Sequence, residues 1–303
     1  MTTFCLPAPA KLNLFLHITG RRADGYHTLQ TVFQILDWSD ELHLRPLATD
    51  ELTFSCSEPA LSGQDNLVLR AARMLLPYRK ETTGWHIHLE KHLPHGGGLG
   101  GGSSDAATTL LALNRLWGCN LDADTLNKLG LQLGADVPVF LHGTSAWAEG
   151  VGEKLEDTAL PPLWYLILTP ACHASTAEIF GHPQLTRDSP PLRIRGFPFS
   201  GCKNDCETVA CMLYPDIEEA LGWLKSQTGT GADGAVHTVE SGLAARMTGT
   251  GSSVFAGFPV REQAAEILAQ LPNQYRDKIR GHIARGVNNS PLHGLLDTLP
   301  DMK

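Results

Sequence analysis

The chain has 303 residues, enough for one large domain or two ordinary ones with a substantial buried core. Its 24 basic residues against 32 acidic residues give a net charge of -8, which argues against nonspecific binding to nucleic acid or to an anionic membrane. The seven cysteines are odd in number and scattered, and no secretory leader is recognisable, so we expect reduced thiols and a cytoplasmic protein.

The first forty residues predict paired strands. Apolar side chains alternate from Leu12 to Ile18, a polar turn follows at 21–25, and residues 26–36 form the next apolar stretch. Residues 85–90 alternate again and lead into a glycine-rich segment. We therefore expect a strand-rich N-terminal region.

Two groups of residues have the side chains of a metal site. His86 and His88 form a His-x-His pair, but with only Glu90 nearby the alternation favours a solvated strand face. The second group has neither a histidine nor a fourth cysteine to complete it, which favours core thiols. Its members are Cys202, Cys206 and Cys211. We predict no metal ligand.

The segment 93–107 is the most unusual in the chain, because six of the seven positions at 96–102 are glycine. Glycine reaches positive φ and has no Cβ, so successive backbone N–H groups can turn inward and meet an anion at close range. The Ser-Ser-Asp sequence at 103–105 predicts the N-terminal cap of a helix over 106–116, whose dipole would point at the loop. The segment therefore predicts a phosphate-binding loop.

Three other kinds of segment share this glycine content. A flexible linker is disfavoured because a capped helix rich in alanine and leucine follows. A P-loop requires Gly-Lys-Ser or Gly-Lys-Thr, which the sequence lacks. Gly96, Gly98 and Gly101 fit a dinucleotide-binding pattern, but residues 121–133 predict a second helix where that fold needs a strand. A dehydrogenase is disfavoured for that reason.

The remainder of the chain alternates between short strands and helices. We expect strands at 145–149 and 164–168, a polar junction at 150–157, an irregular stretch at 181–204, helices at 207–213, 217–224 and 261–271, and a second glycine-rich segment at 248–255. The pattern predicts an α+β fold of two domains, 1–155 and 156–303, with the site between them.

Asp136 is the candidate base for chemistry beside a bound phosphate. It lies between Gly-Ala and an apolar, proline-containing stretch at 137–140, a setting that would exclude water from a carboxylate. Such a carboxylate needs a nearby cation, and Lys11, the only charged residue before Arg21, is its candidate partner. From spacing alone, Asp136 is equally well a helix cap and Lys11 a strand-edge charge.

Five motifs occur in the order seen in kinases of the GHMP superfamily. They are residues 9–14 (Pro-Ala-Lys-Leu-Asn-Leu), 24–27 (Asp-Gly-Tyr-His), 93–107, 134–138 (Gly-Ala-Asp-Val-Pro) and 249–253 (Gly-Thr-Gly-Ser-Ser). The resemblance extends from about Pro9 to the Asn-Asn-Ser-Pro sequence at 288–291, nearly the whole chain. The glycine loop identifies the superfamily, whereas residues 24–27 and the lysine strand resemble the narrower family that acts on a cytidine-diphosphate-linked methylerythritol.

This resemblance implies an N-terminal ribosomal-S5-like α+β domain and a C-terminal ferredoxin-like one. It implies an enzyme that uses ATP to phosphorylate the tertiary C2 hydroxyl of that substrate, in the non-mevalonate route to isoprenoids. Mg²⁺ is expected to accompany ATP, with no protein ligand identified. The alternatives are another small-molecule kinase of the superfamily, of homoserine or mevalonate type, or a catalytically silent nucleotide sensor with the same fold.

The same resemblance assigns roles residue by residue. Asp136 matches the catalytic base and Lys11 its cationic partner. The implied ATP-binding residues are Asn66, Lys91, Pro94, His95, Gly96, Gly97, Gly98, Leu99, Gly100, Gly101, Gly102, Ser103 and Ser104. The implied substrate-binding residues are Asn13 near the methylerythritol, and Tyr26, His27, Thr176 and Phe180 around the cytidine.

Two further expectations concern the recognition of the nucleobase and the partners of the protein. We expect cytosine to lie between aromatic faces, with a nitrogen of His27 accepting a hydrogen bond from the cytosine amino group. Partners are expected to be small molecules only, with no nucleic acid or membrane, and the chain to be a monomer or a weak homodimer.

Overall fold

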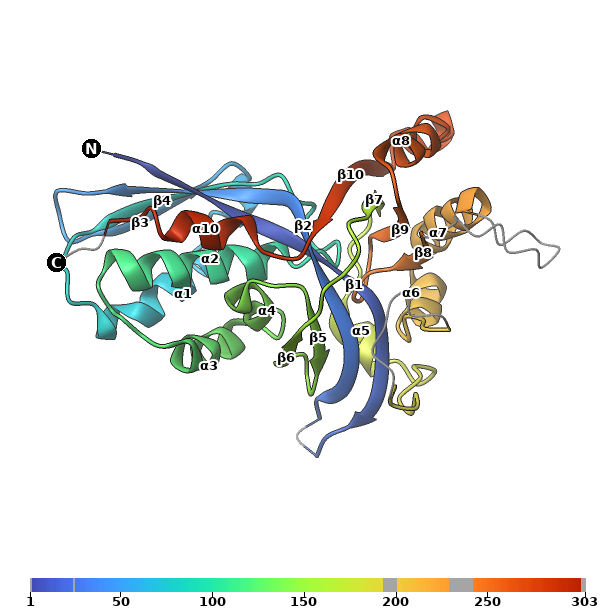
Figure 1. The fold of residues 1–303 in the computed structure, drawn as a ribbon, viewed down its shortest axis with the longest axis horizontal. Coiled ribbons are helices and arrows are strands. Elements are labelled where there is room, and N and C mark those ends of the chain that lie inside the picture. Colours follow the sequence, from blue (N-terminus) through green and yellow to red (C-terminus); the bar gives the residue numbers. More distant parts are fainter. Residues whose placement is uncertain (1, 24, 193–200, 229–241, 301–303) are drawn as a thin grey trace.

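A computed structural model describes residues 2–23, 25–192, 201–228 and 242–300. Within these residues the strands join into one sheet that runs through the whole molecule (Figure 1). The strands are β1 (Phe4–Arg21), β2 (His27–Pro46), β3 (Leu52–Cys56), β4 (Trp85–Glu90), β5 (Ala146–Glu149), β6 (Lys154–Asp157), β7 (Trp164–Pro170), β8 (Leu243–Met247), β9 (Val254–Phe258) and β10 (Ile279–Val287).

The sheet order explains how the two halves of the molecule are joined. The strands lie in the order β3-β4-β2-β10-β7-β9-β8, with β1 and β5 also paired to β2 and β6 paired to β5. The β3–β4 pair is parallel and the other strand pairs are antiparallel. Strand β10 pairs with β7 along 279–285 and with β2 at 286–287, so it bridges the N-terminal and C-terminal parts.

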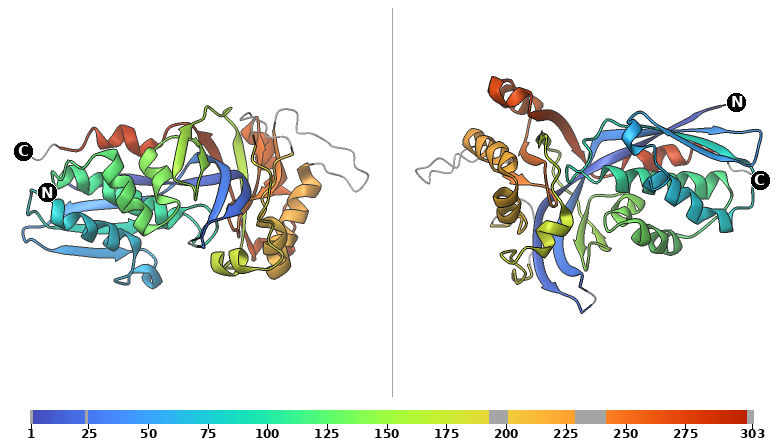
Figure 2. Two further views of the ribbon diagram at one scale, coloured as in Figure 1. Left: turned by 90° about the horizontal axis from the view of Figure 1, so that it is seen from below. Right: turned by 180° about the vertical axis from the view of Figure 1, so that it is seen from behind.

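Helices cover one face of each part of the sheet (Figures 1 and 2). In the N-terminal part, α2 packs against β1, β2 and the neighbouring helices, whereas α7 and α8 pack on the C-terminal strands. The α-helices are α1 (Leu67–Leu75), α2 (Gly101–Leu116), α3 (Ala123–Leu133), α4 (Val137–His142), α5 (Thr176–Gly181), α6 (Glu207–Leu213), α7 (Pro215–Thr228), α8 (Arg261–Ala269), α9 (Asn273–Arg276) and α10 (Pro291–Leu296). Single 3-10 turns lie at Pro59–Leu61 and Leu76–Tyr78.

Three clusters of buried apolar side chains form the core. One lies under the N-terminal helices, one between α6, α7 and the C-terminal strands, and one between β1, β2 and β7 where the parts meet. Leu292 and Leu299, from the last residues described, belong to the N-terminal cluster. The C-terminal residues 292–299 therefore pack against the N-terminal part of the molecule. The division into 1–155 and 156–303 stays a prediction.

Most predicted elements are present, with two corrections. The helix predicted from 106 begins at Gly101, so the Ser-Ser-Asp sequence at 103–105 lies inside its first turns and Gly100, at φ 75°, occupies the cap. The glycine loop thus runs directly into the helix. The polar junction at 150–157 contains β6, which pairs with β5 because the turn at 150–153 reverses the chain. Within the described residues, no helix combines the length and apolar character needed to cross a membrane.

Candidate active site

Strand β1 is irregular at the two residues predicted to carry chemistry. Its register against β2 shifts between Pro9 and Lys11 and again after Asn13. Such bulges turn backbone groups away from the ladder. The Lys11 N–H donates to Leu99 O at 2.9 Å, and the Asn13 N–H donates to Thr248 Oγ1 at 2.9 Å. The bulged strand therefore holds both glycine-rich segments next to its polar side chains.

The Lys11 ammonium group is buried and contacts three oxygen atoms and one aromatic ring. Its side chain is 2% exposed, and Nζ lies 3.1 Å from Asp136 Oδ2. It also donates to Asn13 Oδ1 at 2.6 Å and to Gly98 O at 3.1 Å. The Phe33 ring lies below it, with Nζ 5.5 Å from the centroid. The strand-edge alternative for Lys11 is thereby excluded.

The Asp136 carboxylate does not cap α4, although Asp136 lies at the start of that helix. It occupies the N-cap position of α4, yet its side chain makes no capping hydrogen bond. Proline in the first turn of α4 removes one N–H donor that a cap would otherwise satisfy. The carboxylate instead pairs with Lys11 and is 36% exposed, so it is oriented on one side and open on the other.

The glycine loop requires glycine at alternate positions. Gly96, Gly98 and Gly100 have φ of 70°, 73° and 75°, which other residues rarely adopt. A Cβ at Gly98 would lie 2.4 Å from Thr248 O, and one at Gly100 would lie 2.8 Å from the Phe140 ring. Several of these glycines are therefore required for close packing.

The second glycine-rich segment packs directly on the first. Ser253 N–H donates to Gly97 O at 3.1 Å, and Thr248 Oγ1 donates to Gly98 O at 3.3 Å. Asn204 fixes the second segment by donating from Nδ2 to Met247 O and Gly249 O, at 2.9 and 2.7 Å. This arrangement connects the C-terminal part of the molecule to the loop.

Two cavities meet at the glycine loop. The first, about 560 Å³, is lined by the loop, Asn66, Lys91 and the start of α2. The second, about 980 Å³, is lined by Lys11, Asp136 and residues of β1, β2 and α5. Gly96, Gly98 and Ser103 line both cavities. A group bound against these residues is accessible from both sides, as the transfer of a group between two ligands requires.

A buried ion triad supports the floor of the first cavity. Lys91 Nζ contacts a carboxylate oxygen of Asp40 and lies 3.0 Å from Asp105 Oδ2. Burial alone would lower the pKa of Lys91, but Asp105 and Asp40 outweigh it and raise the pKa. Burial, only partly offset by Lys91, raises the pKa of Asp105 to about 7. Asp40 also accepts from the backbone N–H groups of residues 92 and 93, which fixes the entry to the loop.

An aromatic pair forms the far end of the second cavity. The rings of His27 and Phe180 are stacked, with centroids 5.1 Å apart and an interplanar angle of 29°. Arg187 Nε donates to His27 Nε2 at 3.1 Å, and the guanidinium also donates to Phe180 O at 2.8 Å. Burial, and then the charges of Arg187 and Arg21, lower the pKa of His27, so its ring is neutral at pH 7. Because Nε2 accepts from Arg187, Nδ1 carries the proton of the neutral ring.

Comparisons with known proteins agree with this geometry. Family models match two segments, "GHMP kinases N terminal domain" at residues 66–144 and "GHMP kinases C terminal" at 200–277. The 4-diphosphocytidyl-2-C-methyl-D-erythritol kinase of Shewanella loihica is 50% identical over 287 residues, which cover 94% of this chain and 94% of the relative. The chain belongs to this family of GHMP kinases.

Solved structures agree with the family at the level of the fold. A crystal structure of 4-(cytidine 5'-diphospho)-2C-methyl-D-erythritol kinase matches with a TM-score of 0.77 at 32% identity, covering 94% of this chain and all of the other. A mevalonate kinase matches with a TM-score of 0.64 at 16% identity, a likeness of fold alone. The two-domain α+β GHMP kinase fold predicted from the sequence is therefore confirmed.

Most of the predicted site residues lie around the two cavities. Asn66 caps α1 through Val68 N–H and also donates to Leu61 O, at 2.9 and 2.8 Å, while its side chain lines the first cavity. Thr176 Oγ1 lies 2.9 Å from Thr250 Oγ1 at the wall of the second. The first cavity is also lined by the remaining loop residues, which are Pro94, His95, Gly97, Leu99, Gly100, Gly101 and Gly102.

Three predicted residues differ in setting from the simplest expectation. Lys91 lines the first cavity, but its ammonium is held by two carboxylates and its side chain is 4% exposed. Ser104 is buried beneath the loop and is not among the residues that line either cavity. Tyr26 lines the second cavity with 63% of its surface exposed, and Asp24 of the same motif lies outside the described residues.

Several residues that hold this kinase site together had no recognisable signal in the sequence. Arg187 lies in the irregular stretch and gave no signal, because its contacts with residues 27 and 180 depend on the folded chain. Thr248 and Asn204 support the glycine loop from the C-terminal part. The one available hint was the second glycine-rich segment, whose threonines and serines were not assigned a role.

Proposed function

We propose that this protein transfers the γ-phosphoryl group of ATP to the C2 hydroxyl of 4-diphosphocytidyl-2-C-methyl-D-erythritol, in the non-mevalonate route to isoprenoid precursors. The observation that carries the proposal is the Lys11–Asp136 pair at the wall of the large cavity, beside the loop that this cavity shares with the smaller one. Membership of the family supports the choice of substrate. The smaller cavity would hold ATP and the larger one the cytidine-linked alcohol.

The site residues suit phosphoryl transfer by positioning and electrostatics. The backbone N–H groups at 96–104 and the N-terminus of α2 would bind the triphosphate. Asp136 would accept the proton of the C2 hydroxyl while its oxygen attacks the γ-phosphorus. The bond from that phosphorus to the β–γ bridging oxygen breaks, and its electron pair leaves with ADP. Lys11 would orient the Asp136 carboxylate, with Nζ 3.1 Å from Oδ2.

Magnesium would enter this site with ATP rather than on a dedicated protein ligand. Mg²⁺ is usually held by one or two carboxylates together with substrate phosphates. Of the carboxylates near this site, Asp105 is buried against Lys91, Asp136 pairs with Lys11, and exposed Asp65 lines the first cavity. We propose that the triphosphate oxygens supply most of the metal ligands.

The cytosine would be recognised at the His27–Phe180 stack. From the sequence, a nitrogen of His27 was expected to accept a hydrogen bond from the cytosine amino group. In the structure, however, Nε2 already accepts a hydrogen bond from Arg187. The proton-bearing Nδ1 is then a donor, and it would donate to cytosine N3. Uracil carries a proton on N3, so a donor would face a donor and the uridine-linked analogue would bind poorly.

The proposal extends to the setting in which the enzyme works. All seven cysteines are free thiols, as expected in a reducing compartment, which supports a cytoplasmic location. We propose small molecules as the only substrates, and a monomer or a weak homodimer as the working form.

A coupled assay of ADP release with several acceptors tests the proposed function. We expect turnover with the cytidine-diphosphate-linked methylerythritol and none above background with homoserine or mevalonate. Turnover with one of the latter would reassign the substrate within the superfamily. ATP binding without turnover on any acceptor would instead favour a nucleotide sensor.

A further inference from the structure

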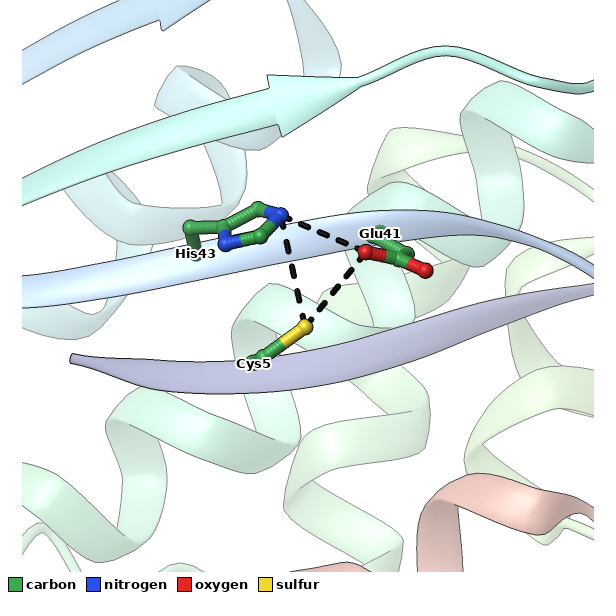
Figure 3. A group of neighbouring side chains, drawn as sticks. All are labelled: Cys5, Glu41 and His43. Atoms are coloured by element: carbon green, nitrogen blue, oxygen red, sulfur yellow. Dashed lines mark hydrogen bonds and ion pairs between the residues drawn. The ribbon is translucent and has the colours of Figure 1, made fainter.

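A second group of chemically active side chains lies away from the two cavities, on the outward face of the N-terminal part of the sheet (Figure 3). Cys5 comes from β1, and Glu41 and His43 come from β2. Cys5 Sγ lies 3.5 Å from Glu41 Oε2 and 4.0 Å from His43 Nε2. The last pair, His43 Nε2 and Glu41 Oε2, is 3.4 Å apart. A thiol, a carboxylate and an imidazole thus converge on one point.

Two of the three distances match one face of a tetrahedron around a zinc-like ion, and the third is slightly longer. Zinc binds thiolate sulfur at about 2.3 Å and imidazole nitrogen or carboxylate oxygen at about 2.0–2.2 Å. With tetrahedral angles, these bond lengths place neighbouring ligand atoms about 3.3–3.6 Å apart. The distances of 3.4 and 3.5 Å lie in that range, and the distance of 4.0 Å exceeds it by a few tenths of an ångström. A small side-chain rotation would bring the sulfur into place.

The sheet holds these ligands in position without help from a metal. Cys5 and His43 are direct partners in the antiparallel register of β1 and β2, and Glu41 lies two residues before His43 on the same face. Directly paired residues have Cβ atoms about 4.5–5.5 Å apart, which suits two ligands of one ion. Binding would therefore require little ordering of the chain.

The protonation of the cluster fits a metal that replaces a proton. The Cys5 thiol donates a hydrogen bond to Glu41 Oε2, so its proton already points at a second ligand of the group. A divalent cation placed among the three groups would displace that proton and bind the thiolate. The His43 ring also lies 5.9 Å from the ring of His88, whose Nε2 is 3.4 Å from Glu90 Oε2.

We propose that Cys5, Glu41 and His43 bind one divalent transition-metal ion of the zinc type, with water in the fourth position. Binding would convert the neutral thiol and the aquated ion into a metal thiolate and one released proton. Cys5 precedes Lys11 by six residues on β1, about 20 Å along an extended strand. The ion would therefore clamp the first strand to its neighbour and take no part in phosphoryl transfer.

Titration of the full-length reduced protein with Zn²⁺, and with Co²⁺ as a spectroscopic substitute, tests the site. We expect one ion per chain, a thiolate-to-cobalt charge-transfer band, and the intense visible bands of tetrahedral cobalt. Cys5→Ser should abolish the charge-transfer band, and both Cys5→Ser and His43→Ala should weaken binding by about tenfold or more. Cys56→Ser and His86→Ala, on the neighbouring strands β3 and β4, are the matched controls and should retain the wild-type affinity.

The released proton gives a second readout. Below the thiol pKa, the affinity for zinc should rise about tenfold per pH unit from the cysteine alone, and Cys5→Ser should lose that dependence. At the same zinc concentration, bound zinc should also raise the Tm of the wild type more than that of Cys5→Ser. Equal affinity in Cys5→Ser, His43→Ala and the wild type would overturn the proposal. So would loss of the charge-transfer band in Cys56→Ser instead of Cys5→Ser.

Discussion

At the scale of single residues, the active site depends on one ammonium group shared among three oxygen atoms. Lys11 Nζ contacts Asn13 Oδ1, Gly98 O and Asp136 Oδ2 within 3.1 Å, in a setting where its side chain is 2% exposed. A buried charge of this kind is stable only when it is paired and hydrogen-bonded. Lys11 and Asp136 therefore depend on each other, and each should lose its function without the other.

The first prediction concerns the base. Asp136→Asn should leave ATP binding nearly intact and lower turnover about a hundredfold or more, because asparagine keeps the shape and cannot accept the proton. The measurement is kcat together with an ATP dissociation constant for the variant and the wild type. Turnover within about threefold of the wild type would mean that the proton goes elsewhere.

Lys11→Met extends this prediction to the pair. It should lower turnover as well, and the double variant with Asp136→Asn should lose much less than the product of the two single effects. Thermal melts must accompany the rates, since Lys11 is buried in the core between the strands. Strictly multiplicative losses would assign the two residues separate roles.

The second prediction concerns how the nucleobase is recognised. The cytidine-linked substrate should be preferred over its uridine-linked analogue by about tenfold or more in kcat/KM, since each mismatched buried polar pair costs roughly 1–3 kcal/mol. His27→Ala should reduce that ratio, because it removes the Nδ1 donor. Phe180→Ala should weaken both substrates alike, because stacking tolerates either base. An unchanged ratio in His27→Ala would point to main-chain contacts.

At the scale of elements, the glycine loop has glycines of two kinds, and the third prediction separates them. A Cβ at Gly102 meets only Leu67 Cδ1 at 3.6 Å and faces the first cavity, so Gly102→Val should fold normally. It should raise KM for ATP roughly tenfold, equivalent to about 1.4 kcal/mol. Gly98→Ala is the contrasting variant, because its Cβ would lie 2.4 Å from Thr248 O and its φ is 73°, and it should lower the Tm. Unchanged ATP affinity in Gly102→Val would mean that the triphosphate does not bind in this cavity.

The fourth prediction concerns the ion triad beneath the loop. The pKa of Asp105 in the folded protein is about 7, above its ordinary value of 3.8, so the folded state binds this proton more tightly than the unfolded chain. The contribution of Asp105 to the free energy of unfolding is therefore greatest below about pH 4 and declines as the pH rises to about 7. Asp105→Asn should remove this decline, whereas exposed Asp124→Asn should not. Identical pH profiles for Asp105→Asn and the wild type would contradict the assignment.

Element prediction from the sequence succeeded where local patterns determine the structure. Residues 123–133 form a helix because their apolar periodicity and the cap at Asp122 agree, and residues 207–213 form the predicted helix without a capping side chain. Residues 85–90 form a strand with its histidines on the more exposed face. The predicted start of α2 was wrong, because the helix begins at Gly101 and includes the glycines at 101 and 102. Packing of the loop against Thr248 O and Phe140 fixes that boundary, and such contacts have no local signature.

At the scale of the whole molecule, the site is assembled from segments far apart in the sequence. The glycine loop was predicted from its residues, whereas spacing left the Lys11–Asp136 pair open and the resemblance to GHMP kinases implied it. The sequence could not predict that β10 joins the two parts of the sheet or that Arg187 orients His27. Those contacts arise only when the C-terminal part packs against β1 and β2.

The most direct test of the two-cavity arrangement is the identity of the product. Phosphorus and carbon NMR of a completed reaction with ATP and the cytidine-diphosphate-linked methylerythritol would locate the new phosphate. We predict one new phosphomonoester, coupled to the quaternary C2 carbon, with both diphosphate signals retained and ADP formed in equal amount. A phosphate on a primary or secondary hydroxyl, or cleavage of the cytidine diphosphate, would contradict the account.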